Sequence, residues 1–317
     1  MYRFIRLGCR AIELVVVSSE VSAGLGERFP DVAALTAALD KTGYLAGDQL
    51  AAALFLAVRM GQPILLEGEP GVGKTEAAKA LATALSTVLV RLQCYEGIAS
   101  GEALYEWNYP KQLLAIRLAE ATHEQVRETD LFREEFLLAR PLLTAIDHPG
   151  PQPAVLLIDE VDRADDEFEA FLFEMLAESS VTIPELGTRR AVVPPVVILT
   201  SNRTRDLHDA LKRRCLYHWI GYPDTARVAS IIRRRVSAAS TALAGEVATA
   251  VGRLRGLELT KPPGIAEAIT WASSVTLFGE SALSPEVAEQ TLSVVVKYPE
   301  DEQAVRDAGL KSVVGHD

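Results

Sequence analysis

The chain has 317 residues, of which 49% are hydrophobic, so it is long enough and apolar enough to bury a sizeable core. Its formal net charge of -11 and its pI of about 5.1 argue against a general nucleic-acid binder, because binding to phosphates needs a basic face. The three cysteines, Cys9, Cys94 and Cys215, are too few and too scattered for a disulfide framework. They fit a reducing compartment, and we expect a cytoplasmic protein.

Residues 1–30 are predicted to form a loosely attached N-terminal extension. The first residues carry Arg3, Arg6 and Arg10 and then a short apolar run, as a signal peptide would. Glu13 interrupts that run and no convincing cleavage pattern follows, so the extension is the better interpretation. No apolar run approaches the roughly 18 residues that a membrane span needs, so we expect no membrane insertion.

Between residues 31 and 222 the pattern alternates between helices and buried strands. Helices are predicted over 31–41, 48–60, 74–86, 130–146 and 165–179, and strands over 63–68, 88–94, 153–161, 196–202 and 215–222. A hairpin around Gly187 is expected to lead into the strand at 196–202. Strands that alternate with helices predict an α/β fold with a parallel sheet covered on both faces. Residues 31–222 should therefore form an αβα domain.

After Pro223 the strand signal fades, and the remaining apolar patterns have a helical period. Helices are predicted within 224–240, 245–257, 264–275 and 284–298. Residues 223–317 should therefore form a second, smaller, helical domain with a C-terminal tail. We find no internal repeat.

The stretch GEPGVGKT, Gly68–Thr75, matches the phosphate-binding pattern G-x-x-x-x-G-K-[ST] in full. It lies between a predicted strand and a predicted helix, where the helix N-terminus attracts anions, and this context disfavours a chance glycine-rich turn. Lys74 would reach the β- and γ-phosphates, and the Thr75 hydroxyl would bind Mg²⁺. The predicted nucleotide contacts here are Gly68, Glu69, Pro70, Gly71, Val72, Gly73, Lys74, Thr75 and Glu76.

Two further strands end in polar residues suited to ATP hydrolysis. The first ends at Asp159, which would hold Mg²⁺, and Glu160 follows, which would orient and deprotonate the attacking water. The alternative is that these carboxylates only end the strand and cap the next helix, and for Asp162 that interpretation is the better one. The second strand ends at Asn202, which would lie beside the γ-phosphate if this strand neighbours that of Asp159.

A basic pair, Arg213 and Arg214, precedes the last predicted strand. Cys215 and His218 follow, but no second pair of ligands accompanies them, so a zinc site is disfavoured. In order along the chain, the phosphate loop, Asp159–Glu160, Asn202, the two arginines and the helical domain resemble an AAA+ ATPase.

The stretches LLEGEPGVGKT, LLIDEVDRA and RPLLTAI resemble the MoxR family, and LKRRCLYHWIGYPD and KPPGIAEAITWA resemble its CoxD-like branch. The resemblance implies ATP and Mg²⁺ as cofactors and a homo-oligomeric ring, usually a hexamer, with ATP at each subunit boundary. It implies that Arg214 reaches the ATP of the neighbouring subunit, with Arg213 as the alternative. It further implies a chaperone-like task, a partner with a von Willebrand factor A domain, and a client such as a carbon monoxide dehydrogenase whose metal site is matured.

The sequence departs from this family pattern in the helical domain. Many relatives carry a phosphate-sensing arginine, called sensor 2, where this chain has Glu267. Either Lys261 substitutes for it, or the helical domain senses nucleotide by packing alone. On the adenine side, Tyr44 and Leu45 are predicted contacts, with core packing as an equal alternative.

The segment 95–118 occupies the place of an insertion in the MoxR family, so Tyr105, Trp107 and Tyr109 are candidates for touching a substrate chain, although ordinary packing is the better interpretation for each. Residues 159–178 contain nine acidic residues, and 203–235 contain nine basic ones. Opposite charges on one subunit suit a head-to-tail contact in a ring, whereas ordinary solvated helix faces are the alternative.

Three other functions stay open at this point. A scaffold that binds nucleotide with negligible turnover is suggested by the carboxylate of Glu267. A nucleic-acid motor is suggested by the basic run at 203–235, and the acidity of the whole chain disfavours it. A small-molecule P-loop kinase is disfavoured by the helical second domain.

Overall fold

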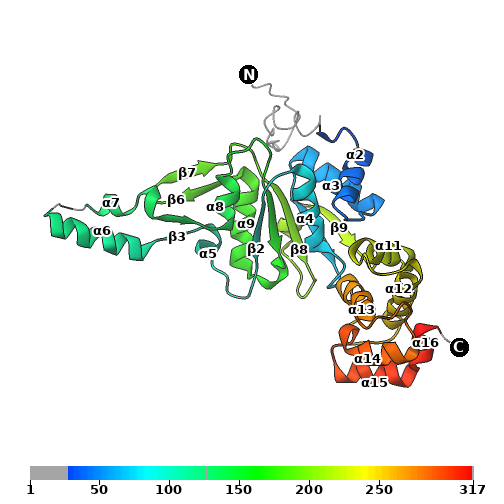
Figure 1. Ribbon diagram of the computed structural model, residues 1–317. Coiled ribbons are helices and arrows are strands. Elements are labelled where there is room, and N and C mark those ends of the chain that lie inside the picture. Colours follow the sequence, from blue (N-terminus) through cyan, green and yellow to red (C-terminus); the bar gives the residue numbers. More distant parts are fainter. Residues whose placement is uncertain (1–27, 124, 126, 316–317) are drawn as a thin grey trace.

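The computed structural model describes residues 28–315 apart from 124 and 126, so residues 1–27 of the predicted extension lie outside the described residues. At its centre is a five-stranded parallel sheet in the order β2-β5-β8-β1-β9 (Figure 1). These strands are β1 (Ile64–Gly68), β2 (Leu89–Gln93), β5 (Val155–Asp159), β8 (Val196–Ser201) and β9 (Leu216–Ile220). They agree with the strands predicted from the sequence.

The three central strands, β5, β8 and β1, are buried along their whole length. Alternate side chains point to opposite faces, which is why a strand covered on both sides reads as a continuous apolar run. On one face Ile64 and Leu157 pack against α2 (Val32–Lys41), α3 (Asp48–Met60) and α4 (Lys74–Leu85). On the other, Leu65 and Leu156 pack against α5 (Ser100–Leu104), α8 (Pro141–Ile146) and α9 (Asp166–Glu178).

An arm projects from the sheet, on the side away from the C-terminal helices (Figure 1). It consists of the antiparallel pair β3 (Tyr105–Trp107) and β4 (Leu137–Ala139) with α6 (Tyr109–Thr122), α7 (Glu128–Leu131) and the 3-10 turn η1 (Glu134–Phe136). The single helix predicted over 130–146 is therefore wrong. Pro141 is the first residue of α8, and a proline disfavours helical backbone in the residue before it, so β4 and Arg140 are extended and separate α8 from α7 and η1.

The aromatic residues of the arm differ in their surroundings. Trp107 is buried and packs edge-on against Tyr105 and Phe132, with ring centroids 6.0 and 5.1 Å away. Tyr109, at the start of α6, is 64% exposed. Packing thus accounts for Trp107 and Tyr105, and Tyr109 keeps a free face. The hairpin expected around Gly187 is present as β6 (Ser180–Ile183) and β7 (Gly187–Arg190).

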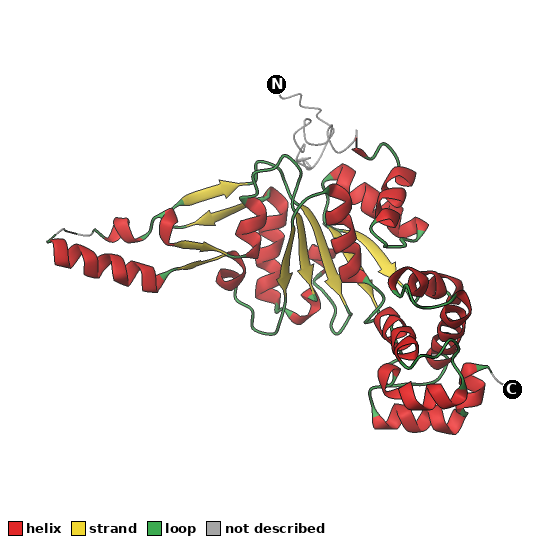
Figure 2. Cartoon of the chain, viewed as in Figure 1, coloured by secondary structure: helices red, strands yellow, loops and turns green. Residues whose placement is uncertain are grey.

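Beyond Tyr222 the described chain contains helices and loops but no strand (Figure 2). The helices are α11 (Thr225–Arg235), α12 (Thr241–Arg255), α13 (Ile265–Leu277), α14 (Pro285–Val295), α15 (Pro299–Ala308) and α16 (Leu310–Val314). They share a hydrophobic core around Trp271, whose indole N–H donates to the Thr291 hydroxyl at 2.7 Å. The last two helices were not predicted. None of the helices within 28–315 has the length and apolar character to cross a membrane.

Candidate nucleotide site

The phosphate-binding loop joins the end of β1 to the start of α4, as the sequence predicted. A Cβ atom at Gly68 would lie 2.1 Å from the carbonyl oxygen of Ile220, so only glycine fits between the two strands. Gly73 has a φ of 97°, in the region that favours glycine. Its carbonyl accepts the first backbone hydrogen bond of α4. The loop therefore follows a path that its glycines make possible.

Lys74 is buried beneath this loop. Its Nζ donates to the carbonyl oxygens of Gly68 at 2.6 Å and Glu69 at 2.9 Å. Burial lowers the pKa of the Lys74 ammonium, and the carboxylates of Asp162 and Asp159 oppose this shift. The ammonium is thus held at the base of the loop, close to where the phosphates of a nucleotide would bind.

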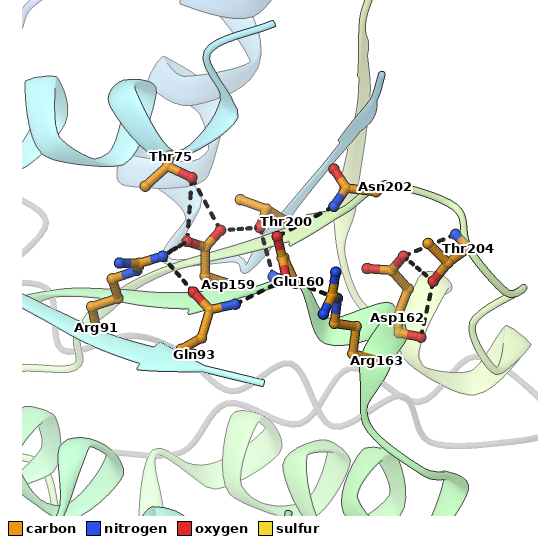
Figure 3. A network of polar contacts seen from close by, with 10 residues as sticks. All are labelled: Thr75, Arg91, Gln93, Asp159, Glu160, Asp162, Arg163, Thr200, Asn202 and Thr204. Carbon is orange, nitrogen blue, oxygen red and sulfur yellow. Dashed lines mark hydrogen bonds and ion pairs between the residues drawn. The ribbon is translucent and has the colours of Figure 1, made fainter. Parts of the chain in front are cut away.

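Asp159, at the end of β5, is the centre of a polar network (Figure 3). Its carboxylate accepts from the Thr75 hydroxyl at 3.1 and 3.2 Å and also from the Thr200 hydroxyl. Arg91, from β2, donates to the same carboxylate through Nε at 2.9 Å and Nη2 at 2.6 Å. The two residues predicted to bind Mg²⁺ are therefore in direct contact, and an arginine compensates the buried charge.

Glu160 stands where β5 ends, with a φ of 55° that is rare for a residue with a side chain. Its backbone N–H donates to the Thr200 hydroxyl at 2.9 Å, which fixes this turn. Its carboxylate accepts from Gln93 at 3.1 Å and from Asn202 at 3.5 Å, and it pairs with Arg163 at 2.9 Å (Figure 3). The predicted neighbourhood of Glu160 and Asn202 follows because β8 pairs directly with β5.

Three residues of this network were not predicted from the sequence, and a fourth had no predicted role. Arg91 and Gln93 lie on one face of β2, and Thr200 lies at the end of β8, so none of them stands in a motif. The sequence offered one indication of their role, which is that each lies on a strand that ends at the same edge of the sheet. Arg163, within the stretch LLIDEVDRA, had no predicted role, and it pairs with Glu160.

Two clefts meet at the loop. One, of about 560 Å³, contains the predicted catalytic and metal residues, and its lining includes Pro70, Gly71, Gly73, Lys74, Thr75, Glu76, Asp159, Glu160, Asn202, Arg235 and Ile265. The other, of about 480 Å³, is lined by the predicted adenine contacts Tyr44 and Leu45, by Val72, and by His218 and Tyr222. Burial raises the pKa of the Tyr44 hydroxyl, which donates to the Gly73 carbonyl at 3.5 Å. The pair has the size and polarity of a site for a nucleotide.

The helical region closes over the loop through the start of α13. The Ile265 N–H donates to the Gly71 carbonyl at 2.9 Å. Glu267, at the sensor 2 position, accepts from the Gly264 N–H at 3.0 Å and so caps its own helix. Lys261 is exposed and lines neither cleft.

Arg213 and Arg214 follow α10 (Asp209–Lys212) and are exposed. Neither lines the two clefts of its own chain. The guanidinium of Arg214 lies over the ring of Phe173, from α9, at 3.8 Å. This contact holds the arginine at the surface of its own subunit.

The zinc interpretation of Cys215 and His218 gains nothing from the structure. Burial raises the pKa of the Cys215 thiol to about 12, so a thiolate ligand is disfavoured. Across the described part of the chain, no three His, Cys, Asp or Glu side chains form a group that could hold a metal.

The acidic and basic segments partly neutralise each other within the chain. Arg205, from the basic segment, pairs with Glu169 and, at 3.4 Å, with Asp166 of the acidic segment. The charge argument for a head-to-tail contact is weaker than the sequence suggested.

A parallel sheet in this strand order, a phosphate-binding loop after β1, acidic residues after β5 and a helical region beyond the sheet define an AAA+ P-loop ATPase. Residues 63–215 match the family described as AAA domain (dynein-related subfamily), and the enzyme is an ATPase. No curated protein matches the chain.

Several solved structures are similar to this chain. A single-residue mutant of RuvB from Thermotoga maritima has 20% identity and a TM-score of 0.46, covering 78% of this chain and 68% of that chain. A second RuvB mutant from that bacterium has 18% identity and a TM-score of 0.48, covering 92% of this chain and 86% of its own. A candidate ATPase from Cytophaga hutchinsonii has 16% identity and a TM-score of 0.44, covering 95% and 97%.

Proposed function

We propose that this chain is a MoxR-type ATPase, which uses Mg²⁺-dependent ATP hydrolysis to remodel or mature a partner protein in the cytoplasm. The observation that carries the hydrolytic part is the convergence of Thr75, Asp159, Glu160 and Asn202 at one edge of the sheet. A non-hydrolysing scaffold would have no need of a carboxylate and an amide beside the metal position.

The residues present fit ATP and Mg²⁺. The Thr75 hydroxyl and the Asp159 carboxylate lie 3.1 Å apart, and both are oxygen donors of the kind that Mg²⁺ prefers. When bound, the metal would neutralise charge on the phosphates. Lys74 and the loop N–H groups would hold the phosphates.

Glu160 would take the proton from the attacking water, and Asn202 would orient that water or the phosphate. The contacts of the Glu160 carboxylate with Gln93 and Arg163 hold it at the cleft. Both roles depend on β8 lying beside β5, as it does.

The test is steady-state ATP turnover by the full chain with Mg²⁺. Glu160→Gln should abolish turnover and keep nucleotide bound, because only the base is lost. Asp166→Asn is a matched control, since it removes an exposed carboxylate that lines neither cleft and should leave turnover unchanged. Wild-type turnover no faster than that of Glu160→Gln would favour the scaffold instead. Turnover stimulated by DNA and suppressed by salt would favour a nucleic-acid motor.

The proposal includes a ring, probed through Arg214. Arg214 is exposed and lies outside the clefts of its own chain, as an arginine serving a neighbouring subunit would. Arg214→Ala and Glu160→Gln subunits should each be inactive alone and partly active when mixed, because each then supplies what the other lacks. Arg213→Ala, mixed in the same way, tests the alternative arginine. Verified mixed rings without any recovery would contradict a role between subunits.

The partner and client are proposed from the stretches KPPGIAEAITWA and LKRRCLYHWIGYPD, which resemble the CoxD-like branch. We propose a von Willebrand A-domain protein as partner and an enzyme of the carbon monoxide dehydrogenase type as client. Nucleotide-dependent copurification of the Glu160→Gln chain with such a protein, compared with wild type, tests this part separately from hydrolysis.

A further inference from the structure

The helical region presents one charged side chain to the phosphate end of the site. Its contributions to the 560 Å³ cleft are Arg235 from the end of α11 and Ile265, Ala266 and Ile269 from α13. Of these, Arg235 alone carries a charge. A cation here faces Lys74 and Thr75 across the cleft, where phosphates would lie.

The positions expected to sense phosphate are otherwise engaged. Glu267 is a carboxylate, and its oxygen accepts the Gly264 N–H at 3.0 Å. Lys261 lies on the loop before α13, where its backbone N–H donates to Asp301 at 3.1 Å, and its side chain lines neither cleft. Within the described residues, a charged contact from the helical region to the phosphates therefore falls to Arg235.

The ion pair that holds the Arg235 side chain in place is weak. Its guanidinium lies 3.0 Å from Glu76, whose carboxylate also pairs with Lys79 at 2.6 Å. Both partners are about two-fifths exposed, and exposed ion pairs are weak. Glu76 would keep a cationic partner if Arg235 left it.

We propose that Arg235 moves from Glu76 to the phosphates of the bound nucleotide and is the residue by which the helical region senses nucleotide in its own subunit. The inference rests on the proposed function. A triphosphate attracts a guanidinium more strongly than a single, already paired carboxylate does, and the planar guanidinium suits two phosphate oxygens at once. Because Arg235 ends α11, its movement would carry the helical region toward the loop.

The experiment measures the dissociation constants of fluorescent ATP and ADP with Mg²⁺, in the Glu160→Gln background so that no turnover occurs. Adding Arg235→Ala should weaken ATP binding about 10- to 100-fold, the usual effect of losing a hydrogen bond to a charged group. ADP binding should change less. Arg235→Lys, which keeps the charge, should recover part of the ATP affinity.

Arg234→Ala is the matched control. Arg234 is the preceding residue of the same helix, and it pairs with Asp40 at 2.7 Å instead of facing the cleft. It should bind ATP within about twofold of the parent. Thermal unfolding midpoints of the two arginine variants should agree, which separates a binding effect from misfolding.

The outcomes separate the two proposals. If the Glu160→Gln parent binds no ATP, the proposed function is overturned and the inference with it. If the parent binds ATP and Arg235→Ala binds as Arg234→Ala does, the inference alone is overturned.

Discussion

The contact between Gly264 and the phosphate-binding loop can be tested by adding one methyl group. In the Gly264→Ala variant, the new Cβ atom would lie 2.9 Å from the Cα atom of Gly71 and 3.0 Å from its carbonyl oxygen. Gly264 has φ −82° and ψ −168°, an extended conformation open to any residue, so the alanine itself is not strained. Glu267 Oε2 would also lie 2.9 Å from the new Cβ atom, and the Gly71 atoms are backbone that cannot turn aside, so the helical region must move away from the loop.

The magnitude follows from one steric overlap and one weakened hydrogen bond. Overpacking of this kind costs about 1–3 kcal/mol. Separation also weakens the hydrogen bond from the Ile265 N–H to the Gly71 carbonyl, now 2.9 Å long, which contributes about 1 kcal/mol. Together they disfavour the closed arrangement by about 2–4 kcal/mol, or at least about 30-fold in its population. Because Ile265 and Ile269 line the cleft, nucleotide affinity should fall as the closed arrangement becomes less populated.

The assay combines nucleotide binding with thermal unfolding. Gly245→Ala is the control, because Gly245 lies within α12 with nothing within 4 Å of its added Cβ atom. That variant should bind nucleotide normally and gain up to about 1 kcal/mol of stability, as alanine replaces glycine in a helix. If Gly264→Ala matches Gly245→Ala in both measurements, the packing argument is refuted.

Three further predictions concern other parts of the site. Arg91→Leu removes a cation from the buried Asp159 carboxylate and should lower the free energy of unfolding by about 1–2 kcal/mol in metal-free urea titrations, and an unchanged midpoint would count against it. Phe173→Leu frees Arg214 from its aromatic contact and should slow ATP turnover about threefold at unchanged nucleotide affinity, and a turnover equal to that of the parent would contradict a role for this contact. Burial lowers the pKa of His218 in the folded chain, so the unfolded chain binds a proton more readily. The free energy of unfolding should therefore fall as the pH drops below 6.5. Thermal unfolding measured between about pH 5 and 8 should show a smaller fall for His218→Gln than for the parent.

The core of the site could be predicted because its signals are local. Gly68–Thr75 is a continuous motif, and its place between a strand and a helix is readable from apolar patterns. Asp159, Glu160 and Asn202 each follow a strongly apolar strand, and parallel strands bring their carboxyl ends to one edge. The proximity of Asn202 to Glu160 also required that β8 lie beside β5, which the sequence left as a condition.

The supporting contacts could not be predicted, because they depend on strand order. Gln93 reaches Glu160, and Arg91 reaches Asp159, only because β2 lies beside β5. Thr200 can bind the same pair only because β8 lies on the other side of β5. Nothing in the strand sequences specifies this order, and isolated polar residues on strands look like solvent-facing positions. The helix predicted over 130–146 failed for a related reason, since its middle pairs with β3.

The carboxylate at position 267 is compatible with a nucleotide site because its charge is used elsewhere. Glu267 lies in the first turn of α13, where the helix dipole favours a negative charge, and its oxygen satisfies the Gly264 N–H. The α13 side chains that line the cleft are the apolar Ile265, Ala266 and Ile269, which can pack on a nucleotide but cannot attract its charge. The apolar side chains of α13 and the charge of Arg235 on α11 would then both contact the nucleotide. Because α11 and α13 share one hydrophobic core, contacts at either helix would move the helical region as a unit.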